Sequence, residues 1–357
     1  GYHSRIPNRD FLICSYNTMT HRWRELAIER SWDLVIWDEC HALKGPPRKV
    51  KRVAAAKKFD APHMIFLSGT PFINRPIELL NTLTMLEPKK WNLTSYGNRY
   101  CGGMDAIEGP FKGATNREEL SRRISHLMLR RLKREVLDEL PDITRIILPV
   151  DIHTDDYNKK VKEMSASNAM VKVNELWHII GMEKAKVAVE WARGFFAEND
   201  THKKLVIYAH HLDVIDFLKK ELREYGTESI DGRVSLTKRD GIIVAFQRSP
   251  RPRVLVINRA GGEGIDLFGA GEIDISDILF VEREWASATE EQAEGRLHRI
   301  GQKNSVAAWY LSALRTYDIS MAEMVDKKRS IMKDIVGVEE VETTIRQDVI
   351  KLLEQPG

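Results

Sequence analysis

Short apolar runs recur along this chain, and each run ends in a polar or glycine-containing segment. They cover residues 11–14, 34–37, 64–67, 205–208, 254–257 and 278–282. Runs this short, rich in Val, Ile and Phe and without polar alternation, are typical of strands that are buried on both faces. We therefore expect two groups of buried strands, one before residue 70 and one after residue 204.

Helical patterns lie between these runs. They cover residues 18–30, 76–86 with Pro76 in the first turn, and 211–225, where Gly226 should end the helix. Residues 151–196 and the charged tail 319–353 also show helical patterns. Strands that alternate with helices predict an α/β fold whose parallel sheets have right-handed crossovers.

The middle of the chain has a different pattern. Residues 91–114 contain glycine and aromatic residues without clear periodicity, which indicates a loop or protrusion. Residues 121–140 carry six basic residues before Glu135, and we expect one basic helix that ends at Pro141. Two interpretations of this helix remain open, a solvated face and a surface that contacts nucleic acid.

Composition limits the class of protein. The 357 residues suffice for two domains, and the net charge of +3 is too small to indicate a nucleic-acid partner by itself. The three cysteines are far apart and lack CxxC spacing, which argues against a zinc site or a disulfide framework. No apolar run approaches the ~20 residues of a membrane span, and no secretory signal is present. We expect an intracellular protein without a membrane partner.

An acidic pair, Asp38 and Glu39, directly follows the run 34–37. Ligands of open parallel sheets bind beyond the carboxyl ends of strands, so both carboxylates lie where a nucleotide would bind. One carboxylate can hold Mg²⁺ while its neighbour orients or deprotonates the attacking water. The alternative is that the pair only caps the N-terminus of a helix.

Three further motifs follow strands or helices. Ser68-Gly69-Thr70 forms a tight turn after the run 64–67, and the glycine-rich residues 260–267 follow the run 254–257. In residues 292–302, Gln292, Arg296 and Arg299 are spaced i, i+4 and i+7, which would place them on one face of a helix. Such an arginine pair suits a phosphoryl group, although a solvated basic face is the alternative.

The order of these motifs resembles that of superfamily-two helicase motors, and within them the Swi/Snf family of DNA-dependent ATPases. Residues 38–41 resemble motif II, 67–71 motif III, 254–267 motif V, and 292–302 motif VI with its His-Arg-Ile-Gly-Gln ending. Residues 130–133, leading to Leu140-Pro141, resemble the inter-lobe signature. Residues 100–102 and 230–232, with Arg239 and Phe246, fit the branch related to annealing-type fork remodellers.

The resemblance implies two RecA-like parallel-sheet lobes, the first of them incomplete, joined by a helical, basic linker. Residues 1–90 would form the C-terminal part of lobe one, and residues 91–141 the protrusion and inter-lobe helix. Residues 142–318 would form lobe two, and residues 319–357 a C-terminal helical extension. A Gly-x-x-x-x-Gly-Lys-Ser/Thr phosphate loop does not occur in the sequence. We expect that loop to precede residue 1 in a longer protein, and we expect this chain alone to hydrolyse little or no ATP.

The resemblance also implies roles for individual residues. Asp38 would bind Mg²⁺ and Glu39 would activate water, while His41, Gly69 and Thr70 would couple the nucleotide to DNA. From lobe two, the nucleotide site would receive Gln292, Arg296 and Arg299 as catalytic groups, together with Gly264 and Asp266. The expected DNA contacts are Ser15, Tyr16, His210, His211, Asn258, Gly261 and Gly262. One position and one segment depart from the family pattern. Asp266 replaces a frequent Asn, and the segment from Glu282 to Ser287 matches only partly.

The implied activity is that of an ATP-dependent hydrolase that translocates along double-stranded DNA, with forked or branched DNA as a further expected substrate. ATP and Mg²⁺ would be its cofactors, and the sequence names no protein partner. The alternatives are a non-enzymatic DNA-binding or partner-binding remnant, and an RNA helicase of the same superfamily. The expected location is the nucleus in a eukaryote, and the cytoplasm or nucleoid in a prokaryote or virus.

Overall fold

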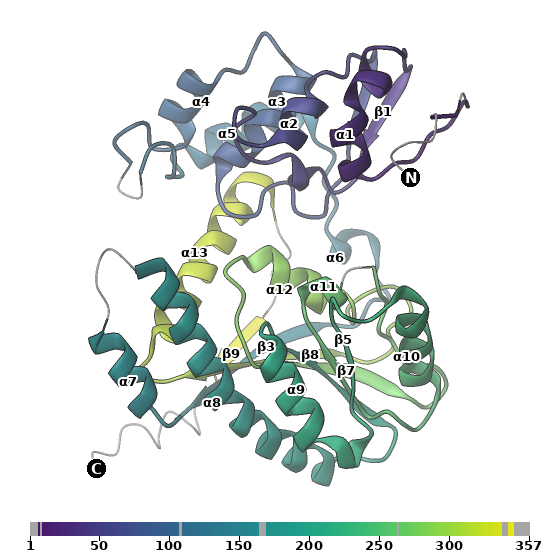
Figure 1. Ribbon diagram of the computed structural model, residues 1–357, viewed down its shortest axis with the longest axis vertical. Coiled ribbons are helices and arrows are strands. Elements are labelled where there is room, and N and C mark those ends of the chain that lie inside the picture. The colour runs from purple at the N-terminus through teal and green to yellow at the C-terminus, as the bar shows by residue number, and fades with distance from the viewer. Residues whose placement is uncertain are drawn as a thin grey trace. The chain divides into compact units, whose positions relative to one another are not determined.

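The computed structural model describes residues 6–7, 9–106, 109–163, 169–262, 264–337 and 342–345 (Figure 1). The chain separates into two compact units. The first unit comprises Gly1–Arg130 and Ser330–Gly337, and the second comprises Arg131–Arg329 and Val338–Gly357. Each unit is described by itself below.

The first unit contains a two-stranded parallel sheet and several short helices. In chain order its elements are α1 (Tyr16–Ala27), β1 (Leu34–Trp37), η1 (Cys40–Leu43), α2 (Lys51–Ala56), β2 (His63–Phe66), η2 (Pro76–Leu79), α3 (Leu80–Leu86), α4 (Leu93–Tyr100), α5 (Arg117–Ile124) and η3 (Ser125–Leu127). Strand β1 pairs in parallel with β2, so that Leu34 lies opposite His63. The strands predicted at 34–37 and 64–67 and the helices predicted at 18–30 and 76–86 are therefore confirmed within one or a few residues.

The sheet of the first unit is covered on one face. Trp37 is buried in a core that includes Val53 of α2 and Met19 of α1. On the other face, Ile36 is 54% exposed and Ile65 is 44% exposed. The expectation that these strands are buried on both faces was wrong for this unit, because the described helices pack against one face only.

Two other expectations for the first unit were wrong. Residues 11–14 form no strand, since Phe11 and Ile13 are exposed and only Leu12 packs on the core. Residues 91–114 are not wholly irregular, because α4 begins after Asn92, whose Oδ1 accepts the Ser95 N–H at 2.9 Å. Gly97 disfavours a helix prediction from the sequence. In the structure, its lack of a side chain leaves room for the Phe111 ring.

Residues 121–140 are not one helix. Helix α5 ends at Ile124, residues 128–132 are irregular, and the short helix α6 (Lys133–Val136) follows in the second unit. Contacts with residues earlier in the chain hold this segment instead. Arg123 lies over the Trp91 ring at 4.8 Å, and Arg130 donates to the Gly69 carbonyl at 2.7 Å. A continuous run of basic side chains on one helix would also repel itself.

The second unit is a larger α/β structure. In chain order, after α6, its elements are β3 (Ile143–Val150), α7 (Asp155–Lys162), α8 (Ala169–Glu198), β4 (Lys203–Tyr208), α9 (Leu212–Glu221), η5 (Arg223–Tyr225), β5 (Glu228–Ile230), α10 (Leu236–Arg248), β6 (Val254–Ile257), α11 (Arg259–Gly262), β7 (Asp274–Phe280), α12 (Ser287–Glu294), β8 (Val306–Ala313), α13 (Tyr317–Val336) and β9 (Glu342–Ile345). The last turns of α13, from Ser330, cluster with the first unit. The expected tail helix is thus confirmed as far as Val336. It was wrong for residues 342–345, which form strand β9 and pair in parallel with β3, because β-branched residues there favour a strand that completes its backbone hydrogen bonds on the sheet edge. Residues 338–341 and 346–353 lie outside the described residues.

All strand pairs of the second sheet are parallel, in the order β5-β6-β4-β7-β8-β3-β9. Successive side chains of β4 point to opposite faces, as in any strand. Leu205 and Ile207 join the core beneath α8 and α9, while Val206 and Tyr208 join the core with α10 and α12. The predicted central strands are therefore buried on both faces.

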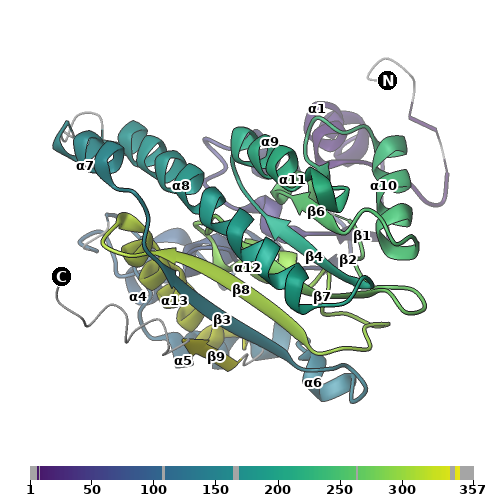
Figure 2. The same cartoon turned by 90° about the horizontal axis from the view of Figure 1, so that it is seen from below.

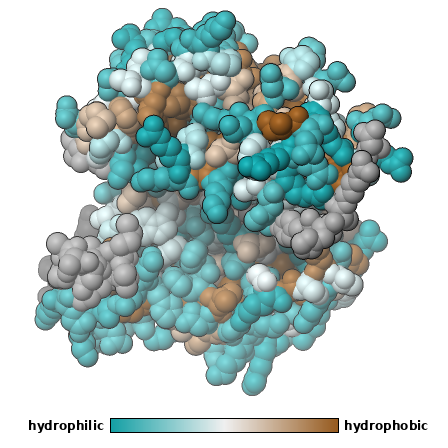
Figure 3. Space-filling model, turned by 45° about the horizontal axis from the view of Figure 1, so that its top comes forward, coloured by the Kyte–Doolittle hydropathy of each residue, from teal (hydrophilic) through white to brown (hydrophobic). Residues whose placement is uncertain are grey.

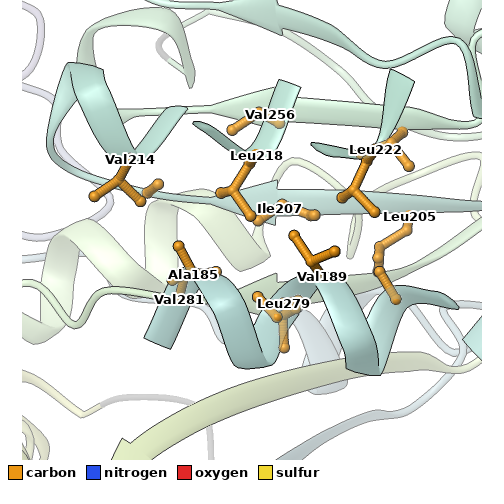
Figure 4. Close-up of a cluster of buried hydrophobic side chains, with 14 of the residues drawn as sticks. Ala185, Val189, Leu205, Ile207, Val214, Leu218, Leu222, Val256, Leu279 and Val281 are labelled. Carbon is orange, nitrogen blue, oxygen red and sulfur yellow. The ribbon is translucent and has the colours of Figure 1, made fainter. Parts of the chain in front are cut away.

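Helices α8 and α9 cover the same face of this sheet (Figures 1 and 2). Figure 4 shows the side chains that meet there: Ala185 and Val189 from α8, Val214, Leu218 and Leu222 from α9, and Leu205 and Ile207 from β4. Gly226, with a φ of 69°, ends the helical segment after η5 as predicted. Because β4, β6 and β7 are neighbours and run in parallel, the segments that follow them meet at one edge of the sheet.

Candidate functional site

The acidic pair lies at the carboxyl end of β1. Backbone hydrogen bonds fix the neighbouring segments, since the Leu67 N–H donates to the Trp37 carbonyl and the Cys40 N–H donates to the Leu67 carbonyl, both at 2.9 Å. Glu39 has a left-handed φ of 46°, a strained conformation for a residue with a side chain. Its carboxylate caps no helix, and both Asp38 and Glu39 are exposed. The structure therefore does not support the N-cap interpretation of Glu39, and both carboxylates are open to a ligand.

His41 joins the two motifs of the first unit. Its Nδ1 lies 3.1 Å from Glu39 Oε2 and 3.2 Å from Ser68 Oγ. The same Ser68 hydroxyl accepts the Thr70 N–H at 3.1 Å. A continuous chain of polar contacts thus runs from the Glu39 carboxylate to the backbone of Thr70, whose side chain is buried.

Ser15 and Tyr16 make local contacts in this unit. The Ser15 side chain caps α1 by accepting the Thr18 N–H at 3.2 Å. The Tyr16 hydroxyl donates to the backbone carbonyl of Asp38 at 2.7 Å, and burial raises the pKa of this phenol. Tyr16 is therefore directly tied to the acidic pair, and the DNA-contact role of both residues stays a prediction.

The three groups of motif VI do not share one helical face as expected. Helix α12 ends at Glu294, with Gln292 in its last turn, and Arg296 and Arg299 lie in the turns beyond it. Leu297 is fully buried in the same core cluster as Ala293 and anchors the turn that follows the helix. The expectation that Gln292, Arg296 and Arg299 lie on one face of a helix was therefore wrong.

Both arginines instead face the glycine-rich loop after β6. The Arg299 guanidinium forms an ion pair with the Asp266 carboxylate, and Arg296 Nη1 donates to the Ile265 carbonyl at 3.4 Å. The Leu267 N–H donates to the Arg296 carbonyl at 2.8 Å. Gly264 in the same loop has a φ of 71° and open space around it, so the backbone there can approach a ligand closely. The structure brings Gly264, Asp266, Arg296 and Arg299 together.

Buried ion pairs anchor α12, and the sequence analysis missed them. The Glu294 carboxylate accepts from Arg145 Nε at 2.6 Å and from the Tyr310 hydroxyl at 2.7 Å. Glu290, also fully buried, accepts from Arg283 Nε at 2.7 Å. Charged residues within or beside apolar runs could have indicated these ion pairs, because a charge in a buried strand needs a partner.

His210 and His211 follow β4 and meet two carboxylates that follow β7. Glu282, which is completely buried, accepts the His210 N–H at 2.7 Å, the His211 N–H at 3.0 Å and contacts His211 Nδ1 at 2.6 Å. Glu284 accepts the Tyr208 hydroxyl at 2.7 Å and lies 3.0 Å from His210 Nδ1. Although burial opposes protonation, Glu284 raises the pKa of His210.

Trp177 of α8 completes this cluster, because its ring lies 4.1 Å from the ring of His210 and 5.8 Å from that of Trp285. In the sequence, Glu282 and Glu284 were recognised only as part of a segment that matches the family pattern incompletely, and their contacts with the histidines were not predicted. Their position directly after a strand was the signal that could have found them. The expected DNA contacts at His210 and His211 stay predictions.

Asn258 and the two glycines form the start of the loop after β6. The Asn258 Oδ1 accepts the Gly261 N–H at 2.8 Å, and its backbone carbonyl accepts the Gly262 N–H at 2.7 Å. A Cβ atom on Gly261 would overlap the carbonyl of Ile230, so the close approach of β5 requires glycine here. This packing explains the glycine without reference to DNA.

The inter-lobe signature carries two basic residues that each bind a motif of their own unit. Arg130 donates to the Gly69 carbonyl of motif III in the first unit. Lys133 donates to the His298 carbonyl of motif VI in the second unit. The ends of this short linker are therefore fixed to motif III and to motif VI.

Comparison with known proteins identifies the domains. The chain matches the SNF2-related domain over residues 3–188, more than half of its length, and the helicase conserved C-terminal domain over residues 185–301. No helix among the described residues is long and apolar enough to span a bilayer.

Curated relatives match most of this chain. It is 32% identical to the SWI/SNF-related matrix-associated actin-dependent regulator of chromatin subfamily A-like protein 1 homolog of Caenorhabditis elegans, over 90% of this chain and 48% of the relative. It is also 32% identical to the human DNA annealing helicase and endonuclease ZRANB3, over 85% of this chain and 29% of the relative. The chain therefore spans about half or less of the length of these relatives.

Among solved structures, the SWI2/SNF2 ATPase core of Sulfolobus solfataricus in complex with dsDNA matches 90% of this chain and 72% of its own chain, with 22% identity and a TM-score of 0.43. The parallel sheets and flanking helices described above agree with the RecA-like α/β fold expected from the sequence. On the strength of the domain match, the chain belongs to the SNF2-related family of helicase-like ATPases.

Proposed function

We propose that this chain forms the larger part of a motor that hydrolyses ATP and uses the energy to move along double-stranded DNA. The observation that carries the proposal is the position of His41, which contacts both the Glu39 carboxylate and the Ser68 hydroxyl. A group in that position can report a change at the acidic pair to the motif III turn. Family membership supports ATP as the substrate.

In the proposed reaction, Glu39 accepts a proton from the attacking water, and Asp38 would hold Mg²⁺. A single exposed carboxylate fits this ion, because Mg²⁺ usually keeps several waters and binds one or two protein carboxylates together with phosphate oxygens. The bound ion would neutralise charge that develops on the phosphates. Among the described residues, no cluster of three or more His, Cys, Asp or Glu side chains could hold a metal by itself.

Arg296 and Arg299 would supply positive charge to the γ-phosphate, and Gln292 would orient the water. Arg299 is held by Asp266, so it would exchange this partner for phosphate during the reaction. The carboxylates belong to the first unit and the arginines to the second. We infer that hydrolysis requires both units to act together, and that this requirement couples ATP turnover to movement on DNA.

Relatives named as annealing helicases make forked or branched DNA the proposed substrate of the complete protein. DNA held mainly through phosphates would give binding that depends strongly on salt and little on sequence. A different relative, named as a regulator of chromatin, favours a nuclear location if the protein is eukaryotic.

The test uses the complete protein that contains this chain. The single variants Arg296→Ala and Arg299→Ala should each lower DNA-stimulated ATPase by roughly a thousandfold, as expected for a lost arginine finger, and leave DNA affinity nearly unchanged. His41→Ala should retain ATP binding but lose the stimulation by DNA. Retained turnover in the arginine variants would refute the assignment. Wild-type protein without any ATPase would favour the non-enzymatic alternative, and stimulation by single-stranded RNA alone would favour the RNA helicase.

A further inference from the structure

A strongly basic segment follows the acidic pair and is not explained by the motifs. Residues 44–58 contain seven lysines and arginines and no aspartate or glutamate. This segment includes helix α2, whose inner face is fixed by Val53 and Ala56, both fully buried. Its basic side chains must therefore lie on the outer face or at its edges.

Helix α1 packs against α2 in the same core of the first unit. The α1–α2 basic surface is defined here by Arg24, Arg48, Lys49, Lys51, Arg52 and Lys58. All of these except the half-buried Arg52 are exposed. Lys58, just beyond the C-terminal end of α2, and Arg24 of α1 both lie over the ring of Trp23, which joins the two helices into one surface.

These cations lack the partners that neutralise other basic residues of the first unit. Arg22 pairs with Glu25, Arg99 with Glu119, and Arg117 with Asp334. Within the described part of the chain, no carboxylate lies at ion-pair distance from any member of the α1–α2 basic surface. Clustered cations repel each other unless an anion joins them, so this surface favours an external polyanion.

Two aromatic rings hold three of the cations in place. Trp23 lies beneath both Arg24, at 5.4 Å, and Lys58, at 5.9 Å, and Tyr16 lies beneath Arg52, at 5.3 Å. Cation–π contacts orient charged groups without neutralising them, and thereby reduce the entropy lost when a ligand binds. Because Tyr16 also donates to the Asp38 carbonyl, the surface adjoins the proposed catalytic carboxylates.

We propose that the α1–α2 basic surface binds the phosphate backbone of DNA, as a contact additional to those expected from the helicase motifs. The cations are spaced along the segment, with the small residue Ala54 between Arg52 and Lys58. Such spaced charges suit the uniformly charged phosphate backbone of a DNA strand. An acidic peptide would be expected to need an apolar anchor as well. Hydrophilic residues and smaller hydrophobic patches are both visible on the face drawn in Figure 3. The proposal rests on the proposed function only in taking DNA as the partner, and on a branched substrate this surface would hold a second arm.

The test compares two triple variants of the complete protein with the same change in net charge. Arg48→Gln/Lys51→Gln/Lys58→Gln removes three of the six cations of the surface, and Arg9→Gln/Lys89→Gln/Lys112→Gln removes three exposed cations elsewhere in the first unit. Fluorescence anisotropy without ATP measures binding to duplex, single-stranded and forked DNA at several salt concentrations. The surface variant should lower the slope of log Kd against log salt by about 2 to 3, since each lost phosphate contact contributes about 0.9 on duplex DNA.

An unchanged slope in the surface variant, or an equal change in the control variant, would overturn the proposal. A glutamate-rich peptide that binds this surface more tightly than DNA would overturn it as well. If the triple variant does not fold, the single variants Lys51→Gln and Lys58→Gln must each lower the slope by about 0.9. Because anisotropy is measured without ATP, these outcomes are independent of whether the protein hydrolyses ATP.

Discussion

Arg130 Nη1 donates a hydrogen bond to the backbone carbonyl of Gly69 at 2.7 Å. The two residues are 61 positions apart in the chain, and Gly69 lies in the turn that His41 links to Glu39 through Ser68. Three residues after Arg130, Lys133 is bound to the His298 carbonyl of motif VI in the second unit. The linker is thus fixed to a motif at each end, and changes in the motif III turn can reach it through one hydrogen bond.

The variant Arg130→Ala should lower kcat of the DNA-stimulated ATPase by about tenfold, since a hydrogen bond from a charged group contributes about 1.5 kcal/mol or more. KM for ATP should change little, because Arg130 contacts the Gly69 carbonyl and is not among the nucleotide ligands proposed above. Steady-state rates at saturating DNA measure both constants. Arg122→Ala, which removes an exposed arginine of α5, is the matched control. A raised KM with unchanged kcat would contradict this role.

Sequence patterns correctly predicted the strands that the local sequence alone determines. The strands at 34–37 and 254–257 occur at the expected residues, because a short apolar run bounded by polar residues has few other stable conformations. The expectation failed where long-range contacts decide. The segment 121–140 divides because Arg130 and Lys133 bind groups far away in the chain.

The same distinction holds for the candidate site. The position of Asp38 and Glu39 after a strand was predictable, because parallel strands place ligands at their carboxyl ends. The contact of Arg299 with Asp266 was not predictable, since it joins the segment after α12 to the loop after β6, 33 positions away in the chain. The Glu282 contacts to His210 and His211 join two strands that are distant in sequence but adjacent in the sheet.

Two glycines of α8 should respond oppositely to alanine. A Cβ atom on Gly181 would overlap the Glu282 carboxylate, which cannot easily move because it holds His210 and His211. Gly181→Ala should therefore lower the free energy of unfolding of the second unit by about 1 to 3 kcal/mol. Gly194 is exposed with open space around it, so Gly194→Ala should raise that free energy by about 0.5 to 1 kcal/mol.

Urea unfolding followed by circular dichroism measures both glycine effects, and Gly194→Ala serves as the control for helix propensity. If Gly181→Ala stabilises the protein as much as Gly194→Ala, the Glu282 carboxylate is not fixed as the structure indicates.

The three thiols should differ in reactivity. Cys14 is exposed, although desolvation raises the pKa of its thiol. Cys40 and Cys101 are buried, and burial raises the pKa of Cys40 to about 11 and that of Cys101 to about 12. Because the thiolate is the reactive form, a disulfide reagent at pH 8 should modify Cys14 in the native protein and the other two only after denaturation.

Counting the protein thiols that react before and after addition of denaturant tests this order. Cys14→Ser should remove the early phase of the reaction entirely. Rapid labelling of Cys40 in native protein would show that the segment after the acidic pair opens readily.

The last prediction concerns pH and the pair His210 and Glu284. Burial disfavours the charged imidazolium, but the Glu284 carboxylate outweighs it and raises the pKa of His210 above the ordinary value of about 6.5, while Arg259 opposes this effect. A raised pKa in the folded state means that the folded protein binds this proton more tightly than the unfolded chain. The stabilisation is therefore fully present below about pH 6.5 and is lost as pH rises through the raised pKa. Burial also opposes ionisation of Glu282, yet the hydrogen bond and charge of His211 lower the pKa of that carboxyl.

Thermal midpoints of the wild type and of His210→Gln, measured from pH 5.5 to 8.5, should differ most at the acidic end and converge toward pH 8.5. His153→Gln is the control, because His153 is exposed and pairs only with the exposed Asp155. A difference between wild type and His210→Gln that is constant across this range would show that His210 acts through packing on Trp177 and not through its charge.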